Sequence, residues 1–301
     1  MKQLILILSI AVAVSQLNPP DGLRSNPPRV WALTNCNIIT EPGNSIENGT
    51  LVIRDGFIDL VGVDILIPAD ASEIDLQGAT VYPGFIESWM PVSTKAGVEP
   101  HGRKHWNFKV HPSLKTADYF NPDSDELEKL HKLGFTSAHI VADTGIFRGQ
   151  SAYIQLDETA TVLRSSVAQV IAYEVDGWGS DAYPNALLGV IALIRQTFLD
   201  GGWYGQARDI SEKYPNGNEL VREDIDLEAL SVSLQSKQPF IFETRDEIYA
   251  LRSNVLADEF KITHWLKGNG FEYRRIDELK KSKPYFILPL DFPKKPDVTE
   301  H

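Results

Sequence analysis

The sequence of 301 residues contains a single cysteine, Cys36. One thiol cannot form an internal disulfide, and metal sites built from several cysteines are excluded as well. Cationic residues are also scarce, with 29 Lys and Arg against 41 Asp and Glu, which gives a net charge of −12. Such an acidic surface repels nucleic acids and anionic membranes, so we expect neither as a partner.

The apolar run at the N-terminus, residues 4–14, is too short to span a bilayer comfortably, since a membrane helix needs about 20 apolar residues. Lys2 precedes this run, and Ala13 and Ser15 form an A-x-S cleavage pattern before Gln16. Residues 1–15 are therefore predicted to be a signal peptide. The protein is predicted to be exported, either periplasmic or secreted, with no membrane span after the signal is cleaved.

Two common catalytic motifs are missing. No serine lies in a G-x-S-x-G elbow, so a serine hydrolase is not supported. The glycines of "DTGIFRGQSA", residues 143–152, lack the spacing and the strand–loop–helix context of a phosphate-binding loop. This segment is predicted to form a β-hairpin turn.

The chain changes its pattern twice after the predicted signal peptide. Residues 16–29 form a Pro- and Asn-rich linker, and residues 30–82 contain short alternating apolar segments separated by Gly, Asn and Asp. That pattern predicts a small β-sandwich or meander. Residues 92–123 have no clear periodicity and are predicted to form a long loop.

From residue 124 onward, helical and strand patterns alternate. Helices are predicted at residues 124–134, 185–203, 226–236, 245–260 and 271–281. Strands are predicted at 135–142, 149–156, 168–174, 239–244, 261–266 and 284–290. Alternating strands and helices are typical of a parallel sheet, and a β-rich segment leading into such a series favours an α/β barrel that carries a small β domain.

Two N-terminal segments add a family resemblance to this pattern. The segments "ALTNCNIITEPGNSIENGTLVIRDGFIDLVG" and "IDLQGATVYPGFIES" resemble the opening of the metal-dependent amidohydrolase superfamily, most nearly its imidazolonepropionase-like branch. The likeness extends from about residue 30 to about residue 290. It implies a (β/α)8 TIM-like barrel over residues 83–290, apparently incomplete because only about seven strands can be counted, beside a small N-terminal β-sandwich over residues 30–82. Residues 291–301 are then a linker or a truncated end.

The resemblance also implies metal-assisted hydrolysis of non-peptide C–N bonds, in which a divalent ion activates water and polarises the carbonyl. The two histidine positions of the family's first strand are occupied here by Trp89 and Pro91, and its aspartate position by Glu87. The later histidine positions fall on Glu243 and near Gly268. Trp, Pro and Gly side chains offer no lone pair to a metal, so no metal is expected in this segment.

Three interpretations of "ESWMP", residues 87–91, follow. The barrel mouth is packed and does no chemistry, with Trp89 buried in the space of the metal. Alternatively, a non-standard active site uses Glu87 and Glu243, with His264 as a further weak candidate, and zinc or another divalent ion belongs to this alternative only. In the third interpretation, Trp89 and Met90 line a small-molecule pocket.

The remaining histidines suggest structural roles. "HGRKHWNFKVH" brings three histidines within 11 residues, but Gly102 and the absence of periodicity argue against a helical metal site, so a polar loop over the barrel mouth is favoured. His139 lies in an apolar strand and is interpreted as a core histidine with its hydrogen bonds satisfied.

Two functional hypotheses remain. In the first, this segment is an amidohydrolase-like pseudoenzyme half that serves as a scaffold, partnered by a downstream amidohydrolase module of the same polypeptide or by self-association. In the second, it is an active hydrolase with a carboxylate-based site.

Overall fold

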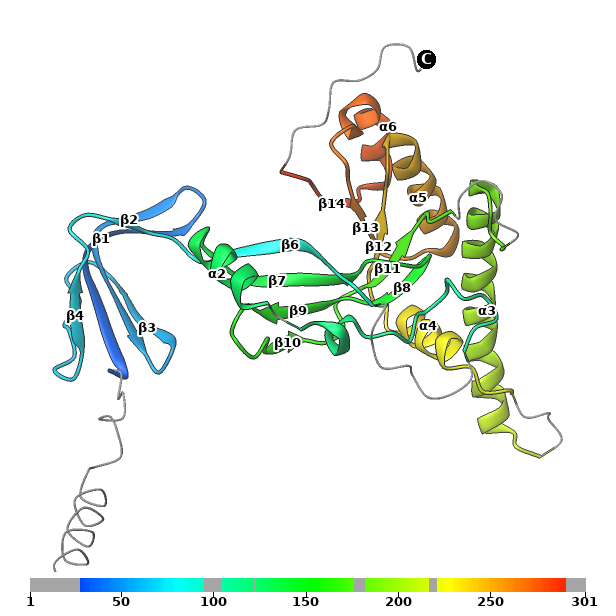
Figure 1. The fold of residues 1–301 in the computed structure, drawn as a ribbon, viewed down its shortest axis with the longest axis horizontal. Coiled ribbons are helices and arrows are strands. Elements are labelled where there is room, and N and C mark those ends of the chain that lie inside the picture. The colour runs from blue at the N-terminus through cyan, green and yellow to red at the C-terminus, as the bar shows by residue number, and fades with distance from the viewer. Residues whose placement is uncertain (1–27, 95–103, 122, 176–181, 217–220, 291–301) are drawn as a thin grey trace, which may run out of the picture. The chain divides into compact units, whose positions relative to one another are not determined.

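The computed structural model describes residues 28–94, 104–121, 123–175, 182–216 and 221–290. These residues form two compact units, which divide between Pro83 and Gly84. Figure 1 shows the elements of each unit. None of the helices in these ranges is both long enough and apolar enough to cross a bilayer. The predicted signal peptide, the 16–29 linker up to residue 27, and residues 291–301 lie outside the described residues.

The N-terminal unit is built on one five-stranded sheet. Its strands are β1 (Val30–Glu41), β2 (Asn44–Arg54), β3 (Phe57–Gly62), β4 (Ser72–Asp75) and β5 (Thr80–Val81). The order is β3-β2-β1-β4, and β5 pairs with β1. The turns joining β1 to β2 and β2 to β3 contain Gly43 and Gly56, both with φ above +80°, a conformation that glycine adopts without strain.

The expected β-sandwich is thus a single sheet in the described residues. Small apolar clusters form around it, one with Val30, Ala32 and Val52 and another with Cys36 and Ile38. The outer strand β3 leaves its apolar side chains uncovered, and Phe57 is 78% exposed.

The second unit contains two sheets. The first has four strands in the order β10-β9-β7-β6. These are β6 (Phe85–Val92), β7 (Phe135–Ala142), β9 (Ala152–Gln155) and β10 (Val162–Arg164). Strands β6 and β7 are parallel. Helix α2 (Ser124–Lys132) begins at Asp123, whose side chain accepts the N–H of Asp125, and its Leu127 packs into the cluster with Ile140.

The second sheet of this unit has five strands in the order β14-β13-β12-β11-β8. These are β8 (Phe147–Gln150), β11 (Gln169–Ala172), β12 (Phe240–Glu243), β13 (His264–Lys267) and β14 (Tyr285–Ile287). Strands β11 to β14 are parallel, and β8 is antiparallel to β11. The parallel series therefore places the carboxyl ends of four strands along one edge.

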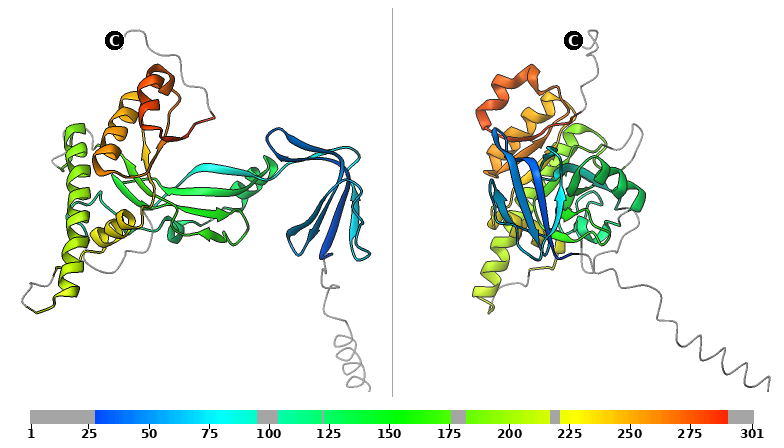
Figure 2. Two further views of the ribbon diagram at one scale, coloured as in Figure 1. Left: turned by 180° about the vertical axis from the view of Figure 1, so that it is seen from behind. Right: turned by 90° about the vertical axis from the view of Figure 1, so that its left-hand side faces the viewer.

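Helices cover one face of this sheet, as Figure 2 shows. They are α3 (Leu187–Lys213), α4 (Ile225–Gln235) and α5 (Glu247–Phe260), followed by the short η2 (Glu272–Arg275), α6 (Ile276–Leu279) and η3 (Lys280–Ser282). Phe198 of α3 stacks edge-on against Phe240 of β12, with ring centroids 5.3 Å apart. Together with Phe242 and Leu256 they form the largest buried cluster. The helix predicted at 185–203 is longer than expected and continues to Lys213.

The strands do not close into a barrel within the described residues. Each of β6 and β14 pairs with one neighbour only, β7 and β13 respectively. A TIM-like barrel, which the sequence predicted in incomplete form, is therefore not formed by the described residues, and its strands are divided between two sheets of one α/β unit. The segment 143–152 connects these sheets, because β8 pairs with β11 and β9 pairs with β7. The hairpin expected there is wrong, since its two strands enter different sheets.

The loop predicted at 92–123 is only partly solvent-facing. Its first residue, Val92, still belongs to β6, η1 (Thr116–Tyr119) lies near its end, and its last residue, Asp123, caps α2. His105, Asn107, Lys109 and Val110 are all buried, so the part from residue 104 onward is a packed segment and not a polar cover. His101 lies outside the described residues.

Candidate functional site

Residues 87–91, for which three interpretations were given, lie in β6 next to the buried strand β7. Oε1 of Glu87 accepts the backbone N–H of Trp89 at 3.0 Å, and the pairing with β7 is irregular between Glu87 and Met90. Trp89 is half-buried, and its ring lies edge-on to His139, with centroids 6.3 Å apart. Lys267 of β13 places its Nζ 5.8 Å from the centre of the same ring. Trp89 therefore lies between the two sheets of the unit.

A shallow cavity of about 300 Å³ opens beside Trp89. Its walls come from β6, the start of β7, and the end of β13 and β14. They comprise Ile86, Glu87, Ser88, Trp89, Phe135, Lys267, Ile287, Leu288, Pro289 and Leu290. Met90 packs instead against the cluster beneath α2. The pocket interpretation therefore holds for Trp89 in geometry, whereas Met90 faces the other way.

His139 is buried and neutral at physiological pH. Its Nδ1 lies 3.1 Å from the carbonyl oxygen of Ser88, so Nδ1 carries the proton and donates it. Burial lowers the pKa of His139, and the bond to Ser88 opposes this shift only partly. Its Nε2 is buried and has no hydrogen-bond partner among the described residues. The expected core histidine is thus satisfied at one nitrogen only.

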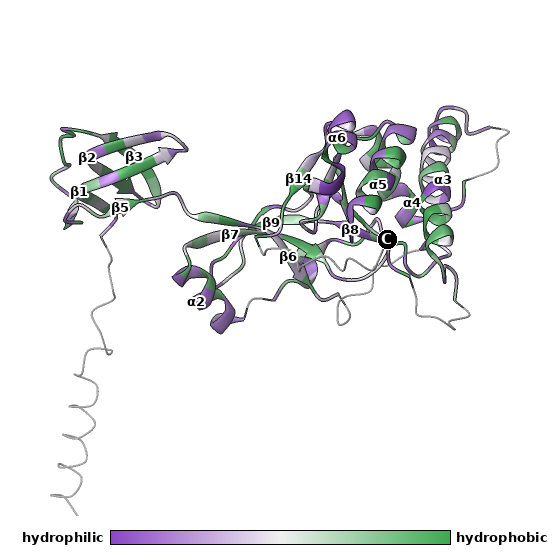
Figure 3. Cartoon of the chain, turned by 90° about the horizontal axis from the view of Figure 1, so that it is seen from above, coloured by the Kyte–Doolittle hydropathy of each residue, from purple (hydrophilic) through white to green (hydrophobic). Residues whose placement is uncertain are grey.

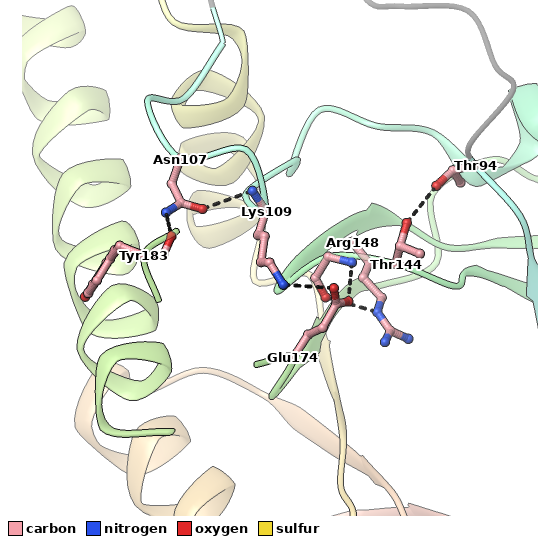
Figure 4. Close-up of polar contacts among 8 residues, drawn as sticks. Thr94, Asn107, Lys109, Thr144, Arg148, Glu174 and Tyr183 are labelled. Atoms are coloured by element: carbon pink, nitrogen blue, oxygen red, sulfur yellow. Dashed lines mark hydrogen bonds and ion pairs between the residues drawn. The ribbon is translucent and has the colours of Figure 1, made fainter. Parts of the chain in front are cut away.

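Two carboxylates mark the carboxyl ends of neighbouring strands, and each is held by a cation of the same chain. Glu243 ends β12, and its Oε2 lies 2.7 Å from Nη1 of Arg148, whose side chain is only 11% exposed. Glu174 follows β11, and its Oε1 lies 3.0 Å from Nζ of Lys109, which is 4% exposed. The backbone N–H of Gly145 donates to the second oxygen of Glu174 at 2.7 Å. Figure 4 shows Lys109 and Glu174 meeting beside Arg148.

Comparison with solved structures identifies this arrangement of strands and helices. The chain is similar to an amidohydrolase from Thermotoga maritima MSB8, with a TM-score of 0.74 and 20% sequence identity, over 88% of this chain and 72% of that one. The chain has an amidohydrolase fold. A prolidase (TM-score 0.38, 12% identity, 88% of this chain and 79% of that one) and an N-acyl-D-glutamate deacylase from Bordetella bronchiseptica (0.36, 14%, 86% and 57%) match too weakly to carry an argument. No family model matches the chain, and no curated protein matches its sequence.

The residues that the resemblance assigns to metal positions do not fit a metal ion. Trp89 and Pro91 have no side-chain lone pair to donate, and Pro91 is exposed. The carboxylate of Glu243 is already neutralised by Arg148. Within the described ranges, no group of three or more His, Cys, Asp or Glu side chains lies close enough together to hold an ion.

Gly268 also lacks space for a larger side chain. A Cβ atom added there would lie 2.5 Å from Oε1 of Glu272. That carboxylate accepts the backbone N–H groups of Asn269 at 2.7 Å and of Gly270 at 2.9 Å, and it is buried. A histidine at 268 would therefore displace a carboxylate that closes the turn after β13.

The weak candidates Glu87, Glu243 and His264 are not brought together. Glu87 binds the backbone of its own strand, and Glu243 binds Arg148. His264 packs edge-on against Phe242, and its Nε2 lies 2.8 Å from Oδ1 of Asn254 on α5. Its ring therefore lies on the helix-covered face of the sheet, where burial lowers its pKa.

Sequence reasoning missed Arg148, Lys109 and Glu174. Each belongs to a segment interpreted as a turn, a loop or an ordinary strand. A signal was present, because Arg148 and Lys109 stand among apolar neighbours in "GIFRG" and "NFKVH". Arg and Lys are seldom buried without a partner, so these two positions already required carboxylates nearby.

Proposed function

We propose that this protein is a member of the amidohydrolase superfamily, of its imidazolonepropionase-like branch, whose described α/β unit serves as a scaffold without a catalytic metal. The ion pair between Arg148 and Glu243 carries this proposal. A guanidinium group supplies the positive charge that a metal would otherwise bring to Glu243, at a strand end where this fold can carry chemistry. Trp89, Pro91 and Gly268 support the same conclusion, since none can replace the missing ligands.

Zinc binding tests the proposal. We expect elemental analysis of the purified chain, after exposure to zinc and gel filtration, to show far less than one ion per chain. A matched variant, Glu259→Ala, removes a surface carboxylate paired with Arg195. One tightly held zinc per chain that is lost in Glu243→Ala but kept in Glu259→Ala would overturn the proposal and revive the metal-dependent alternative.

A second candidate function is small-molecule binding beside Trp89. The half-buried indole, the Lys267 ammonium near its face and the cavity of about 300 Å³ favour it. Indole faces bind planar or cationic groups well. The carboxylate-based hydrolase has no comparable support, since Glu87, Glu243 and His264 each have a different partner.

We further propose that another protein segment pairs with the open strand edges of the second unit. Unpaired N–H and C=O groups along β6 and β14 are a template for an added strand. The partner is a downstream amidohydrolase module of the same polypeptide or a second copy of this chain. Light scattering is expected to show self-association of this chain alone, whereas a stable monodisperse monomer would contradict the proposal.

Export remains part of this proposal. We expect the secreted or periplasmic form to begin at Gln16, after removal of residues 1–15. N-terminal sequencing of the protein recovered from the producing cells checks this, and an intact Met1 would contradict it.

A further inference from the structure

A second and larger cavity lies at the opposite end of the five-stranded sheet, where β12 and β13 begin. Its volume is about 640 Å³, which is within the range of small-molecule pockets, about 300–1,000 Å³. Helix α3 forms one wall, and the segments that lead into β12 and β13 form the others. The cavity is thus separate from the Trp89 pocket, which lies at the carboxyl ends of the strands.

The base of this cavity is apolar. Phe198, Phe240 and Phe260 line it, and the rings of Phe198 and Phe260 are stacked with centroids 4.7 Å apart. Trp203 and Leu199 of α3 also line it, and the Trp203 side chain is 64% exposed. Figure 3 shows α3 carrying apolar and polar residues along its length. An apolar chain or ring of a ligand could therefore be covered here.

Two lysines line the same cavity, and both have unusual backbone conformations. Lys237 follows α4 with φ of +56°, and Lys261 ends α5 with φ of +55°. Helices that end in this left-handed conformation usually place glycine or asparagine there. Lysine at both positions therefore carries a backbone strain that a glycine would avoid, which suggests that the ammonium groups have a role.

Neither ammonium group has an ionic partner in the described part of the chain. No ion pair joins Lys237 or Lys261 to a described carboxylate, although the protein as a whole has a net charge of −12. The other polar side chains of the cavity, from Gln206, Ser233, Gln238 and Thr263, are uncharged. The cavity thus combines an apolar base with a local excess of positive charge.

We propose that this cavity binds an amphipathic carboxylate, with its apolar part against the three phenylalanines and its carboxylate beside Lys237 and Lys261. A charged hydrogen bond to an ammonium group would fix the head of the ligand, and burial of the apolar part would supply most of the affinity.

Decanoate is a suitable probe, with decanol and decyltrimethylammonium as neutral and cationic analogues of the same length. Calorimetric titration of the full chain is expected to show one decanoate site. Both analogues should bind about tenfold more weakly or worse, because neither carries a negative charge that pairs with the ammonium groups. Equal affinities for decanol and decanoate would show that the lysines do not bind the carboxylate, and would overturn the proposal.

Substitutions of the two lysines distinguish the effect of their charge on ligand binding from an effect on folding. The double variant Lys237→Gly/Lys261→Gly removes both charges while keeping a residue that suits positive φ. It is expected to fold normally and to lose about tenfold or more in affinity for decanoate. Lys283→Gly is the matched control, because Lys283 also has positive φ, at +47°, but does not line the cavity. An equal loss in the control would overturn the proposal.

Gly202 allows the cavity itself to be closed. It lies on α3 and lines the cavity, and an added Cβ there meets no atom within 4 Å. Gly202→Phe should fill the space and abolish decanoate binding, whereas Gly202→Ala should retain it, and both remove a helix-weakening glycine. Full binding in Gly202→Phe, with the fold confirmed by circular dichroism, would show that the ligand binds elsewhere.

Discussion

The two ends of the sheet formed by β8 and β11–β14 differ in how their charges are satisfied. At the carboxyl ends, Glu243 and Glu174 are each held by a buried cation of the same chain. At the opposite end, Lys237 and Lys261 border a cavity of about 640 Å³ and pair with no described carboxylate. The carboxylates at the carboxyl ends, where this fold can carry chemistry, are thus neutralised by internal cations. The two lysines at the opposite end remain available to bind an anion.

The largest expected loss of stability comes from removing the cation that neutralises Glu243 at the carboxyl ends of the strands. Arg148→Met leaves Glu243 without its cation, and because Glu243 is one-third exposed, we expect a loss of about 3 kcal/mol, at the low end for broken buried pairs. Urea denaturation measures it. The control Arg195→Met breaks a pair with Glu259 in which both side chains are about 40% exposed, and it should cost less than about 1 kcal/mol. Similar losses of stability in the two variants would mean that the Arg148–Glu243 pair contributes no more than a surface ion pair.

A smaller loss is expected for Trp89→Ala. The indole is half-buried and contacts His139 and Lys267, so the cost should be about 2 kcal/mol, below the 3–5 kcal/mol of a fully buried aromatic residue. Trp203→Ala, at an exposed position, should change stability by less than about 0.5 kcal/mol. Thermal unfolding of both variants decides the matter, and an unchanged midpoint for Trp89→Ala would reject its packing role.

Acid should weaken the second unit through its buried histidines. Burial lowers the pKa of His139, His105 and His264 in the folded state. The unfolded chain then binds more protons, so stability is fully present above the unfolded pKa of about 6.5 and declines as the pH falls below it, by at most about 1.4 kcal/mol per pH unit for each histidine. Stability measured by urea from pH 7.5 to 5 should follow this slope. His139→Asn should make it shallower, and an unchanged slope would exclude His139 as a contributor.

The smallest effect is expected at the open end. Lys237→Gly relieves a left-handed conformation after α4, so the variant should be as stable as the parent or more stable by up to about 1 kcal/mol. Its thermal midpoint measures this gain. A clear loss of stability would show that Lys237 has a structural role, in contrast to the ligand-binding role inferred above.

The sequence predicted the order of helices and strands in the second unit well, because hydrophobic periodicity and helix-capping residues are local features of the chain. Asp246 caps α5 through the N–H groups of Ile248 and Tyr249, near the predicted start at 245. The sequence predicted an incomplete barrel, but the division of its strands into two sheets could not be predicted from the same patterns, since it depends on pairing between distant strands. The sequence left a β-sandwich and a meander open for residues 30–82, because alternating strands do not specify whether they form one sheet or two. The structure has one sheet, in which β1, β2 and β3 pair in succession as in a meander.

For the candidate site, the sequence predicted only which metal ligands are missing, and not which residues form the ion pairs. Trp89, Pro91 and Gly268 could be found by the resemblance, but the partners of Glu243 and Glu174 come from residues 95 and 65 positions away in the chain. Such pairs are created by topology, because Arg148 lies on the strand that runs antiparallel beside β11. A buried cation in the sequence indicates that a carboxylate is near, but not which one.

The tight turn at Gly268 couples two residues in any attempt to engineer a metal site into this chain. A histidine placed at 268 first would meet Glu272 and uncap the turn before it could bind anything. Shortening Glu272 first would leave two partly buried N–H groups without their acceptor, at up to about 1–3 kcal/mol for each group. Either single substitution is therefore expected to lose stability with no gain in function, so engineering a metal ligand at 268 requires both residues to change together.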